Sequence, residues 1–209
     1  LPIYFVFITY SGVNSMPDIA MKPNRRLLLF LPLAHVFARY MQFFCFAGNV
    51  SLGLSSNLKT ILADFKAFKP TFILAVPRIF EKIYNAASQK AGAGFKGRVF
   101  ADATQTAYDW SHAQQSGGSI PLALNAKHAL YNKLVYSSIM EVFGGHVEYA
   151  VSGGAPLDSS IAHFFNGVGL PLLEGYGMTE TCAPSSVNPT EGYKIGTIGL
   201  PLQGVTMGV

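Results

Sequence analysis

Two glycine-bearing segments hold the residues of this sequence that are best suited to chemistry. The first, residues 151–157 (VSGGAPL), directly follows a strand expected at 146–151. A glycine pair at the carboxyl end of a strand permits a sharp turn and lets a ligand approach the backbone closely, and ligands of open α/β sheets bind outside those strand ends. A plain strand-to-helix connection, with Asp158 or Ser159 capping the helix, explains the same pattern. Both interpretations stay open.

The second segment lies farther along the chain at residues 173–182 (LEGYGMTETC). A short apolar strand is followed there by Gly175, Tyr176, Gly177, Thr179 and Glu180. The Thr179 hydroxyl can donate to a phosphate oxygen, and the Glu180 carboxylate is a hard oxygen ligand of the kind Mg²⁺ prefers. The flat face of Tyr176 can stack on a purine base. The alternative makes Tyr176 a core aromatic and Thr179–Glu180 the start of a helix.

Other common catalytic and metal-binding patterns are missing from the 209 residues. Ser152 is not surrounded by a GxSxG elbow, and spacing assigns it no histidine partner. Cys45 and Cys182 form no CxxC unit, and the five histidines follow no HxxxH or HExxH spacing. We therefore expect no disulfide framework and no cysteine or histidine metal site. This is consistent with a reducing, cytoplasmic compartment.

Composition restricts the class of protein further. Half of the residues are hydrophobic and 12% are charged, which excludes a disordered chain. No apolar run reaches the roughly 20 uninterrupted residues that a membrane-spanning helix needs. The net charge is +4, and the basic excess lies in residues 1–120. Because the basic residues are scattered apart from 22–26, we expect no nucleic-acid binding. A phosphorylated ligand, or peripheral contact with the inner membrane, stays open.

The elements expected around these segments alternate between strand and helix. Strands are predicted at 25–32, 49–54, 71–76, 146–151 and 171–173. Helices are predicted at 55–68, 77–90, 95–115, 121–143 and 158–165, and residues 11–24 are turn-like. The apolar run of the strand expected at 25–32 is continuous rather than alternating, as in strands covered on both faces. The pattern predicts an α/β fold with a largely parallel sheet.

Five segments, taken together, resemble one family. Residues 176–181 (YGMTET) look like the YGxTE signature of the acyl-adenylate-forming superfamily, and residues 152–157 (SGGAPL) resemble its adenine-binding segment. Residues 31–39 (LPLAHVFAR), 76–82 (VPRIFEK) and 196–204 (GTIGLPLQG) are similar to segments of the long-chain fatty-acyl-CoA synthetases within it. The five occur in the family's order and extend over nearly the whole chain. A single match can arise by chance, whereas a series in order is specific.

The resemblance implies the layered parallel-sheet and helix architecture of the large N-terminal domain of adenylate-forming enzymes. It implies ATP-dependent activation of a long-chain fatty acid to acyl-AMP, followed by transfer to coenzyme A, with ATP and Mg²⁺ as cofactors. Carried onto this sequence, the adenine would be lined by Gly153, Gly154 and Ala155, with Tyr176 stacked on it between Gly175 and Gly177. Thr179 would contact phosphate, Glu180 would hold Mg²⁺, and His35 would stand near the reacting carboxylate. Arg39 receives no catalytic role.

A cluster of aromatic residues follows His35 and offers a second expectation. Phe37, Tyr40, Phe43, Phe44 and Phe46 can border a channel for a long alkyl chain. A buried alkyl chain gains roughly 0.8 kcal/mol per CH₂, so apolar walls confer affinity without directional contacts. Ordinary helix packing explains the same residues equally well.

The family pattern is incomplete in residues 1–209. We expect these residues to form part of the AMP-binding (adenylation) N-terminal domain, because the phosphate loop (TSGTTGxPKG) and the C-terminal domain are absent. The chain begins without Met and closes on an apolar stretch read as a strand. We therefore expect the remainder of a longer chain to be missing, and the isolated piece to be inactive. Two alternatives stay open: a fatty-acyl-AMP ligase acting on a carrier protein, and a non-catalytic lipid- or nucleotide-binding relative.

Overall fold

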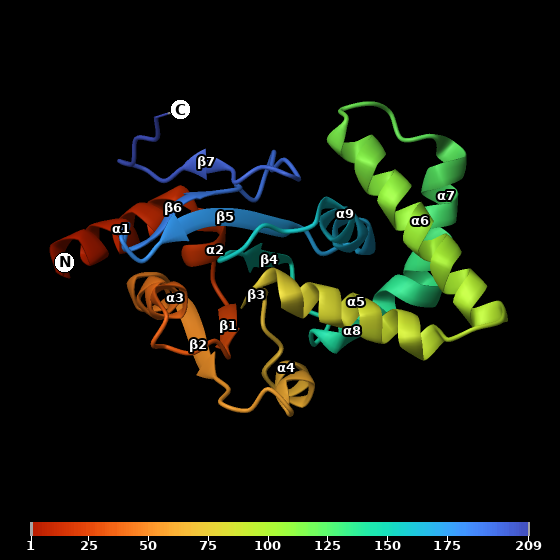
Figure 1. Cartoon of the computed structure of the whole chain (residues 1–209), viewed down its shortest axis with the longest axis horizontal. Helices are drawn as coiled ribbons and strands as arrows, with labels where there is room; N and C mark the ends of the chain where they lie inside the picture. Colours follow the sequence, from red (N-terminus) through yellow and green to blue (C-terminus); the bar gives the residue numbers. More distant parts are fainter. Residues whose placement is uncertain (1, 209) are drawn as a thin grey trace.

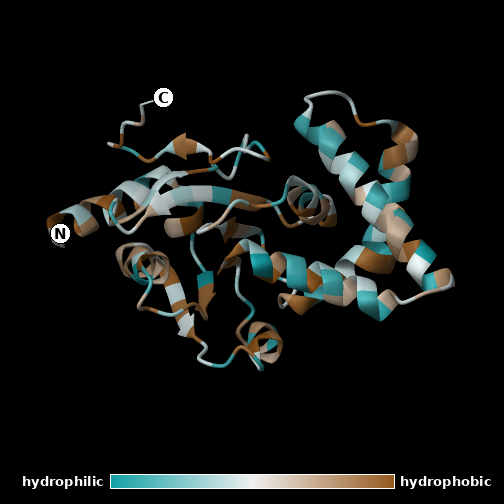
Figure 2. Ribbon diagram, viewed as in Figure 1, coloured by the Kyte–Doolittle hydropathy of each residue, from teal (hydrophilic) through white to brown (hydrophobic). Residues whose placement is uncertain are grey.

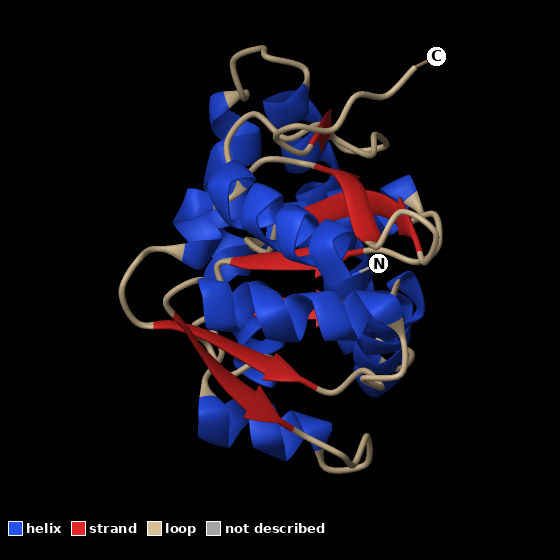
Figure 3. Ribbon diagram, turned by 90° about the vertical axis from the view of Figure 1, so that its left-hand side faces the viewer, coloured by secondary structure: helices blue, strands red, loops and turns tan. Residues whose placement is uncertain are grey.

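A twisted sheet runs through the molecule, with helices on both of its faces (Figure 1 and Figure 3). The computed structural model describes residues 2–208, and Leu1 and Val209 lie outside them. The strand expected where the sequence ends is not observed in the described part of that stretch, because residues 205–208 form no helix or strand. Within residues 2–208 the sheet has seven strands in the order β2-β1-β3-β4-β5-β6-β7. The strands are β1 (Arg25–Leu29), β2 (Val50–Leu54), β3 (Phe72–Ala75), β4 (Tyr149–Ser152), β5 (Leu172–Met178), β6 (Ala183–Val187) and β7 (Leu200–Pro201). The predicted α/β architecture is confirmed: β1 to β5 are parallel, and β6 and β7 run antiparallel.

Helices account for most of the remaining chain. They are α1 (Pro2–Ser15), α2 (Pro17–Ala20), α3 (Val36–Ala47), α4 (Ile61–Phe68), α5 (Pro77–Ala91), α6 (Phe95–Gln115), α7 (Leu122–Tyr131), α8 (Ser137–Val142) and α9 (Ser159–Val168). Figure 1 shows α6 and α7 lying side by side at the end of the molecule opposite the N-terminus. In Figure 2 hydrophobic and hydrophilic residues alternate along α5 and α6, as expected for helices with one packed face. Between residues 2 and 208 no helix is both long and apolar enough to span a bilayer.

The sheet separates two hydrophobic cores. Leu27, Leu74 and Leu173 face α1, α2 and α3, whereas Leu28, Ile73 and Leu172 face α4, α5, α6, α8 and α9. Successive residues of a strand point to opposite faces, so each central strand must be apolar on both. This is why the strands read as continuous apolar runs in the sequence.

The turn-like interpretation of residues 11–24 is wrong over much of its length. Helix α1 continues to Ser15, and α2 follows directly from Pro17. The first half of α1 packs on α3, with Phe5 against Phe43. Ile8 and Val13 of α1 are buried. Tertiary packing therefore stabilises a helix that the Ser, Asn and Gly content disfavours locally.

Two predicted helices differ from those observed. The helix expected at 55–68 begins only at Ile61, because the Asn57 side chain accepts a hydrogen bond from the Lys59 N–H and makes a turn before it. The helix expected at 121–143 is divided into α7 and α8 by a π-helical stretch, Asn132–Tyr136. The helices expected at 77–90 and 95–115 are confirmed, as α5 and α6.

The strand expected at 171–173 is the element whose difference from prediction bears most on function. Strand β5 does not end at Leu173 but continues to Met178, because Gly175–Met178 pair with β6. The interpretation of Gly175, Tyr176 and Gly177 as residues that follow a strand is therefore wrong; they lie within it. As successive strand residues, Gly175 and Tyr176 therefore face opposite sides of the sheet, and a shift of register against β6 follows Tyr176.

Candidate functional site

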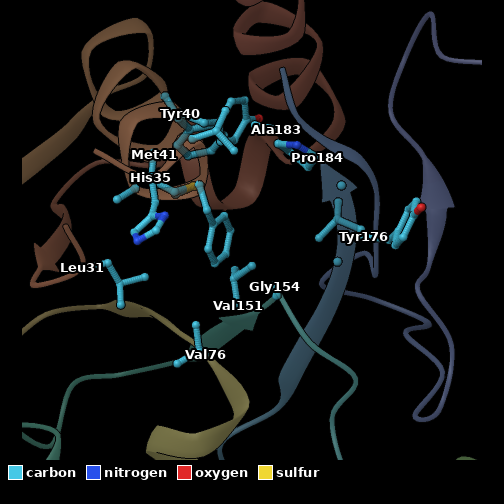
Figure 4. Close-up of a pocket in the computed structure, with 18 of the residues that line it drawn as sticks. Leu31, His35, Tyr40, Met41, Val76, Val151, Gly154, Tyr176, Ala183 and Pro184 are labelled. Atoms are coloured by element: carbon cyan, nitrogen blue, oxygen red, sulfur yellow. The ribbon is translucent and has the colours of Figure 1, made fainter. Parts of the chain in front are cut away.

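A cavity of about 530 Å³ lies between α3 and the carboxyl ends of the parallel strands (Figure 4). Leu31 follows β1, Val76 follows β3, and Gly153 follows β4, so the lining on the sheet side comes from three adjacent strand ends and from β5. The opposite wall is α3. The volume of the cavity is in the usual range for small-molecule sites. The cavity also lies where open α/β sheets bind ligands, at the carboxyl ends of the strands.

Most of the residues singled out from the sequence gather around this cavity. It is lined by His35, Gly153, Gly154, Gly175, Tyr176, Gly177 and Thr179. Ala155 and Glu180 do not line it, and both are exposed at the ends of the same two segments. Segments that are distant in sequence therefore meet at one place, while the role of each residue stays a prediction.

Two glycines are required by the backbone rather than by a ligand. Gly154 has φ +83°, in the left-handed region that other residues rarely adopt. At Gly177 a Cβ atom would lie 2.1 Å from the Ala183 carbonyl oxygen, because the backbone of the paired strand β6 lies directly beside it. Gly177 therefore permits the close approach of β6 to β5, which closes one side of the cavity.

Tyr176 lies on the face of β5 opposite Gly175, its neighbour in the strand. Figure 4 shows its ring directed away from the other labelled cavity residues, and 41% of the residue is exposed. The interpretation of Tyr176 as a core aromatic is therefore wrong. An exposed ring at a strand end is available for stacking on a planar ligand.

Thr179 and Glu180 lie in the turn that reverses the chain from β5 into β6. They do not start a helix, so that alternative is also wrong. The turn is strained, since Cys182 and Ala183 have φ of 60° and 103°, and such strain concentrates at functional sites. Thr181 stabilises it: the hydroxyl accepts a hydrogen bond from the Met178 N–H at 3.0 Å and lies 2.9 Å from the Ala183 carbonyl oxygen. Sequence reasoning missed Thr181, although a threonine following Thr179 and Glu180 was visible.

His35 and Arg39 have separate environments at the start of α3. His35 occupies the N-cap position, is exposed, and lines the cavity on the same side as Leu31 (Figure 4). Arg39 does not line the cavity. Its guanidinium donates to the Leu33 carbonyl at 3.2 Å and to the Gln42 side chain at 3.1 Å, which fixes the entry into the helix.

The aromatic residues of α3 divide according to the helical period. Phe37, Tyr40 and Phe44 line the cavity, whereas Phe43 and Phe46 are 42% and 65% exposed and pack on each other. The predicted apolar border is thus observed for three of the five residues. Burial raises the pKa of the Tyr40 phenol well above its ordinary value, so the phenol stays neutral.

Several cavity residues had no signal in the sequence. Met16 and Ile19 reach it from the α1–α2 region, and Val187 reaches it from β6. Each looks like an ordinary core residue when the sequence is read alone. Only the crossing of these elements over the sheet brings them to the same wall as α3.

A parallel α/β sheet with an apolar cavity and glycine segments at its strand ends defines a ligand-binding α/β domain. The family model described as "AMP-binding enzyme" matches residues 6–209, so the chain belongs to the AMP-binding enzyme family. Solved structures agree on the fold. The N-terminal domain of FACL13 from Mycobacterium tuberculosis is similar with a TM-score of 0.59 and 18% identity, over 93% of this chain and 37% of that one.

Curated relatives carry names of one enzyme class. The chain is 44% identical to the long-chain-fatty-acid–CoA ligase FadD15 of Mycobacterium bovis, over 93% of this chain and 32% of the relative. It is 34% identical to long chain acyl-CoA synthetase 3 of Arabidopsis thaliana, over 85% of this chain and 26% of the relative. The chain therefore spans about a third or less of the length of these relatives.

Proposed function

We propose that this chain belongs to an AMP-forming ligase that activates a long-chain fatty acid with ATP and transfers the acyl group to coenzyme A. One observation carries the proposal: a single cavity combines an apolar wall on α3 with the two glycine segments at the ends of β4 and β5. An alkyl chain and a nucleotide phosphate need these two environments side by side. The names of the relatives support the same activity.

The apolar wall suits the acyl chain. Helix α3 starts with exposed His35 at the rim, and its later cavity residues Tyr40, Met41 and Phe44 are buried. An alkyl chain lying along this wall gains roughly 0.8 kcal/mol for each CH₂ removed from water. Its carboxylate would then emerge near His35, at the polar end of the cavity.

The polar end suits the nucleotide. The exposed ring of Tyr176 can stack on adenine, and the backbone of Gly153 and Gly154 leaves room for its edge. Thr179, in the exposed turn after β5, can donate its hydroxyl to a phosphate oxygen. In the proposed reaction a carboxylate oxygen of the fatty acid forms a bond to the α-phosphorus while pyrophosphate leaves, and the coenzyme A thiol then displaces AMP.

The residues present also fit a magnesium ion. Within residues 2–208 no three His, Cys, Asp or Glu side chains cluster as a metal site. Mg²⁺ bound with a nucleotide usually takes only one or two carboxylates, and its other ligands are phosphate oxygens and water. The exposed Glu180 carboxylate beside Thr179 can supply that contact. When bound, Mg²⁺ would neutralise charge that develops on the phosphates.

The decisive experiment uses the full-length protein. We expect fatty-acid-dependent exchange of labelled pyrophosphate into ATP, and acyl-CoA formation when coenzyme A is added. Replacing Glu180 by Ala removes the proposed metal contact, so Mg²⁺-dependent exchange should fall about 100-fold, the usual loss for a group that stabilises transition-state charge.

Three other outcomes would change the assignment. Exchange with acyl transfer only to a carrier protein would identify a fatty-acyl-AMP ligase. Binding of ATP without any exchange would identify a non-catalytic relative. Undiminished exchange by Glu180→Ala would contradict the proposed role of Glu180 while leaving the ligase activity intact.

A further inference from the structure

The short loop between β4 and α9, residues 153–157, leads from the cavity at Gly153 to the start of α9. At its far end Asp158 caps α9 by accepting hydrogen bonds from the backbone N–H groups of Ser160 and Ile161, at 2.8 and 3.3 Å. Among residues 2–208, one side chain alone hydrogen-bonds to the loop backbone: Glu174, whose Oε1 accepts from the Leu157 N–H at 3.2 Å. This hydrogen bond joins the far end of the loop to β5.

Glu174 is itself fixed from three sides. Its backbone is paired with Ser152 at the end of β4. Its carbonyl oxygen accepts a hydrogen bond at 2.9 Å from the backbone N–H of Asn188, the residue directly after β6. Its half-buried side chain is on the α9 side of the sheet, where Leu157 is buried. A carboxylate anchored in this way can hold a loop at a constant distance from the strand.

The loop and the strand meet where the two glycine segments face each other. Gly153 and Gly154 begin the loop, and Tyr176 lies two residues after Glu174 on the same face of β5. A planar ligand held between the loop and the Tyr176 ring would need a gap of defined width. The Glu174–Leu157 hydrogen bond joins the loop to the strand that carries Tyr176.

We infer that Glu174 is a positioning residue for nucleotide binding: it holds the 153–157 loop at the separation from Tyr176 that a purine base requires. The inference rests on the proposed function, because it needs a nucleotide at this end of the cavity. Glu174 touches no reacting atom in this scheme. It acts through Leu157 and the loop backbone.

The test measures binding and kinetics in the full-length protein with Glu174→Ala, Glu174→Gln and Glu141→Ala. The Ala variant loses the hydrogen bond to the Leu157 N–H, and we expect the Kd for ATP by calorimetry and the KM for ATP to rise about tenfold, as is typical for loss of a charge-assisted hydrogen bond. The KM for the fatty acid should stay within about twofold. The Gln variant keeps an acceptor oxygen and should recover most of the ATP affinity. Glu141, exposed on α8, is the matched control for loss of a carboxylate.

Each result separates this inference from the proposed function. A wild-type protein that does not bind ATP would overturn the proposed function. ATP binding that is equal in wild type and Glu174→Ala would overturn the positioning role alone. A joint rise of both KM values with a lower melting temperature in Glu174→Ala, without recovery by Gln, would show a general structural role and would also overturn it.

Discussion

The two faces of β5 show how one strand can serve two different binding environments. On the α3 side, Gly175 and Gly177 line the apolar cavity and have no side chains to fill it. On the α9 face, Glu174 and Tyr176 present a carboxylate and an aromatic ring. The alternation of side chains along the strand separates the two without any additional element. The proposed acyl and nucleotide sites would meet at the carboxyl end of β5, where both Gly175 and Tyr176 line the cavity.

The largest effect is expected from adding a side chain at Gly177 of β5. Gly177→Ala places a Cβ atom 2.1 Å from the Ala183 carbonyl oxygen, which is backbone and cannot rotate away. We expect β5 and β6 to separate and the free energy of unfolding to fall by about 3 kcal/mol, measured by urea denaturation.

The control for this change is Gly118→Ala. Gly118 lies in the connection between α6 and α7, where a Cβ atom would meet nothing within 4 Å. A similar loss of stability in both variants would mean that the close approach of β6 to β5 is not the reason for glycine at position 177.

A smaller effect is expected from α3, the cavity wall opposite Gly175 and Gly177. Met41→Ala removes a buried cavity side chain from α3, and loss of its contacts should raise the KM for a long-chain fatty acid about tenfold while leaving the KM for ATP unchanged. Phe46→Ala is the matched control on the same helix, since Phe46 points away from the cavity. Steady-state kinetics of the full-length protein test this. Equal effects of the two variants would contradict the assignment of this wall to the acyl chain.

The smallest effect is expected at Asp158, the N-cap residue of α9. The Asp158 pKa is lowered, first by the hydrogen bond from the Ser160 hydroxyl and then by the backbone N–H groups of Ser160 and Ile161. A carboxyl group with a lowered pKa in the folded state stabilises the fold above its unfolded pKa, and this contribution is lost as the pH falls through its folded value. Asp158→Ala should cost about 1 kcal/mol at pH 7 and less below pH 4.

Denaturation at the two pH values measures this contribution. Asp158→Asn provides the comparison, because Asn is an equally good N-cap but does not titrate. The Asn variant should therefore retain its stability at low pH relative to wild type. A cost of Asp158→Ala that is independent of pH would show that the charge of Asp158 has no part in capping α9.

Local sequence patterns predicted the elements that depend on local interactions. Helices α5 and α6 match their expected bounds within a residue, because Pro77 begins one and Gly92 and Gly94 separate the two. The N-cap expected at Asp158 or Ser159 is observed at Asp158, because it too depends on hydrogen bonds between neighbouring residues. The errors at α1 and β5 arise where a distant partner overrides local preference, whereas the late start of α4 reflects a local turn at Asn57. Packing on α3 maintains the helix of residues 2–15, and pairing with β6 extends the strand through Tyr176.

The sequence by itself determined the family, the alternation of strand and helix, and the residues of the two glycine segments, because these depend on residue type and spacing along the chain. Only the tertiary structure decided which side of β5 each residue occupies. It also decided that Phe37 lines the cavity while Phe46 does not, and that Glu174 holds the loop after β4. The physical reason is that side-chain direction depends on where a strand begins and what it pairs with. Extending β5 past Leu173 is what turns two adjacent residues, Gly175 and Tyr176, toward opposite faces.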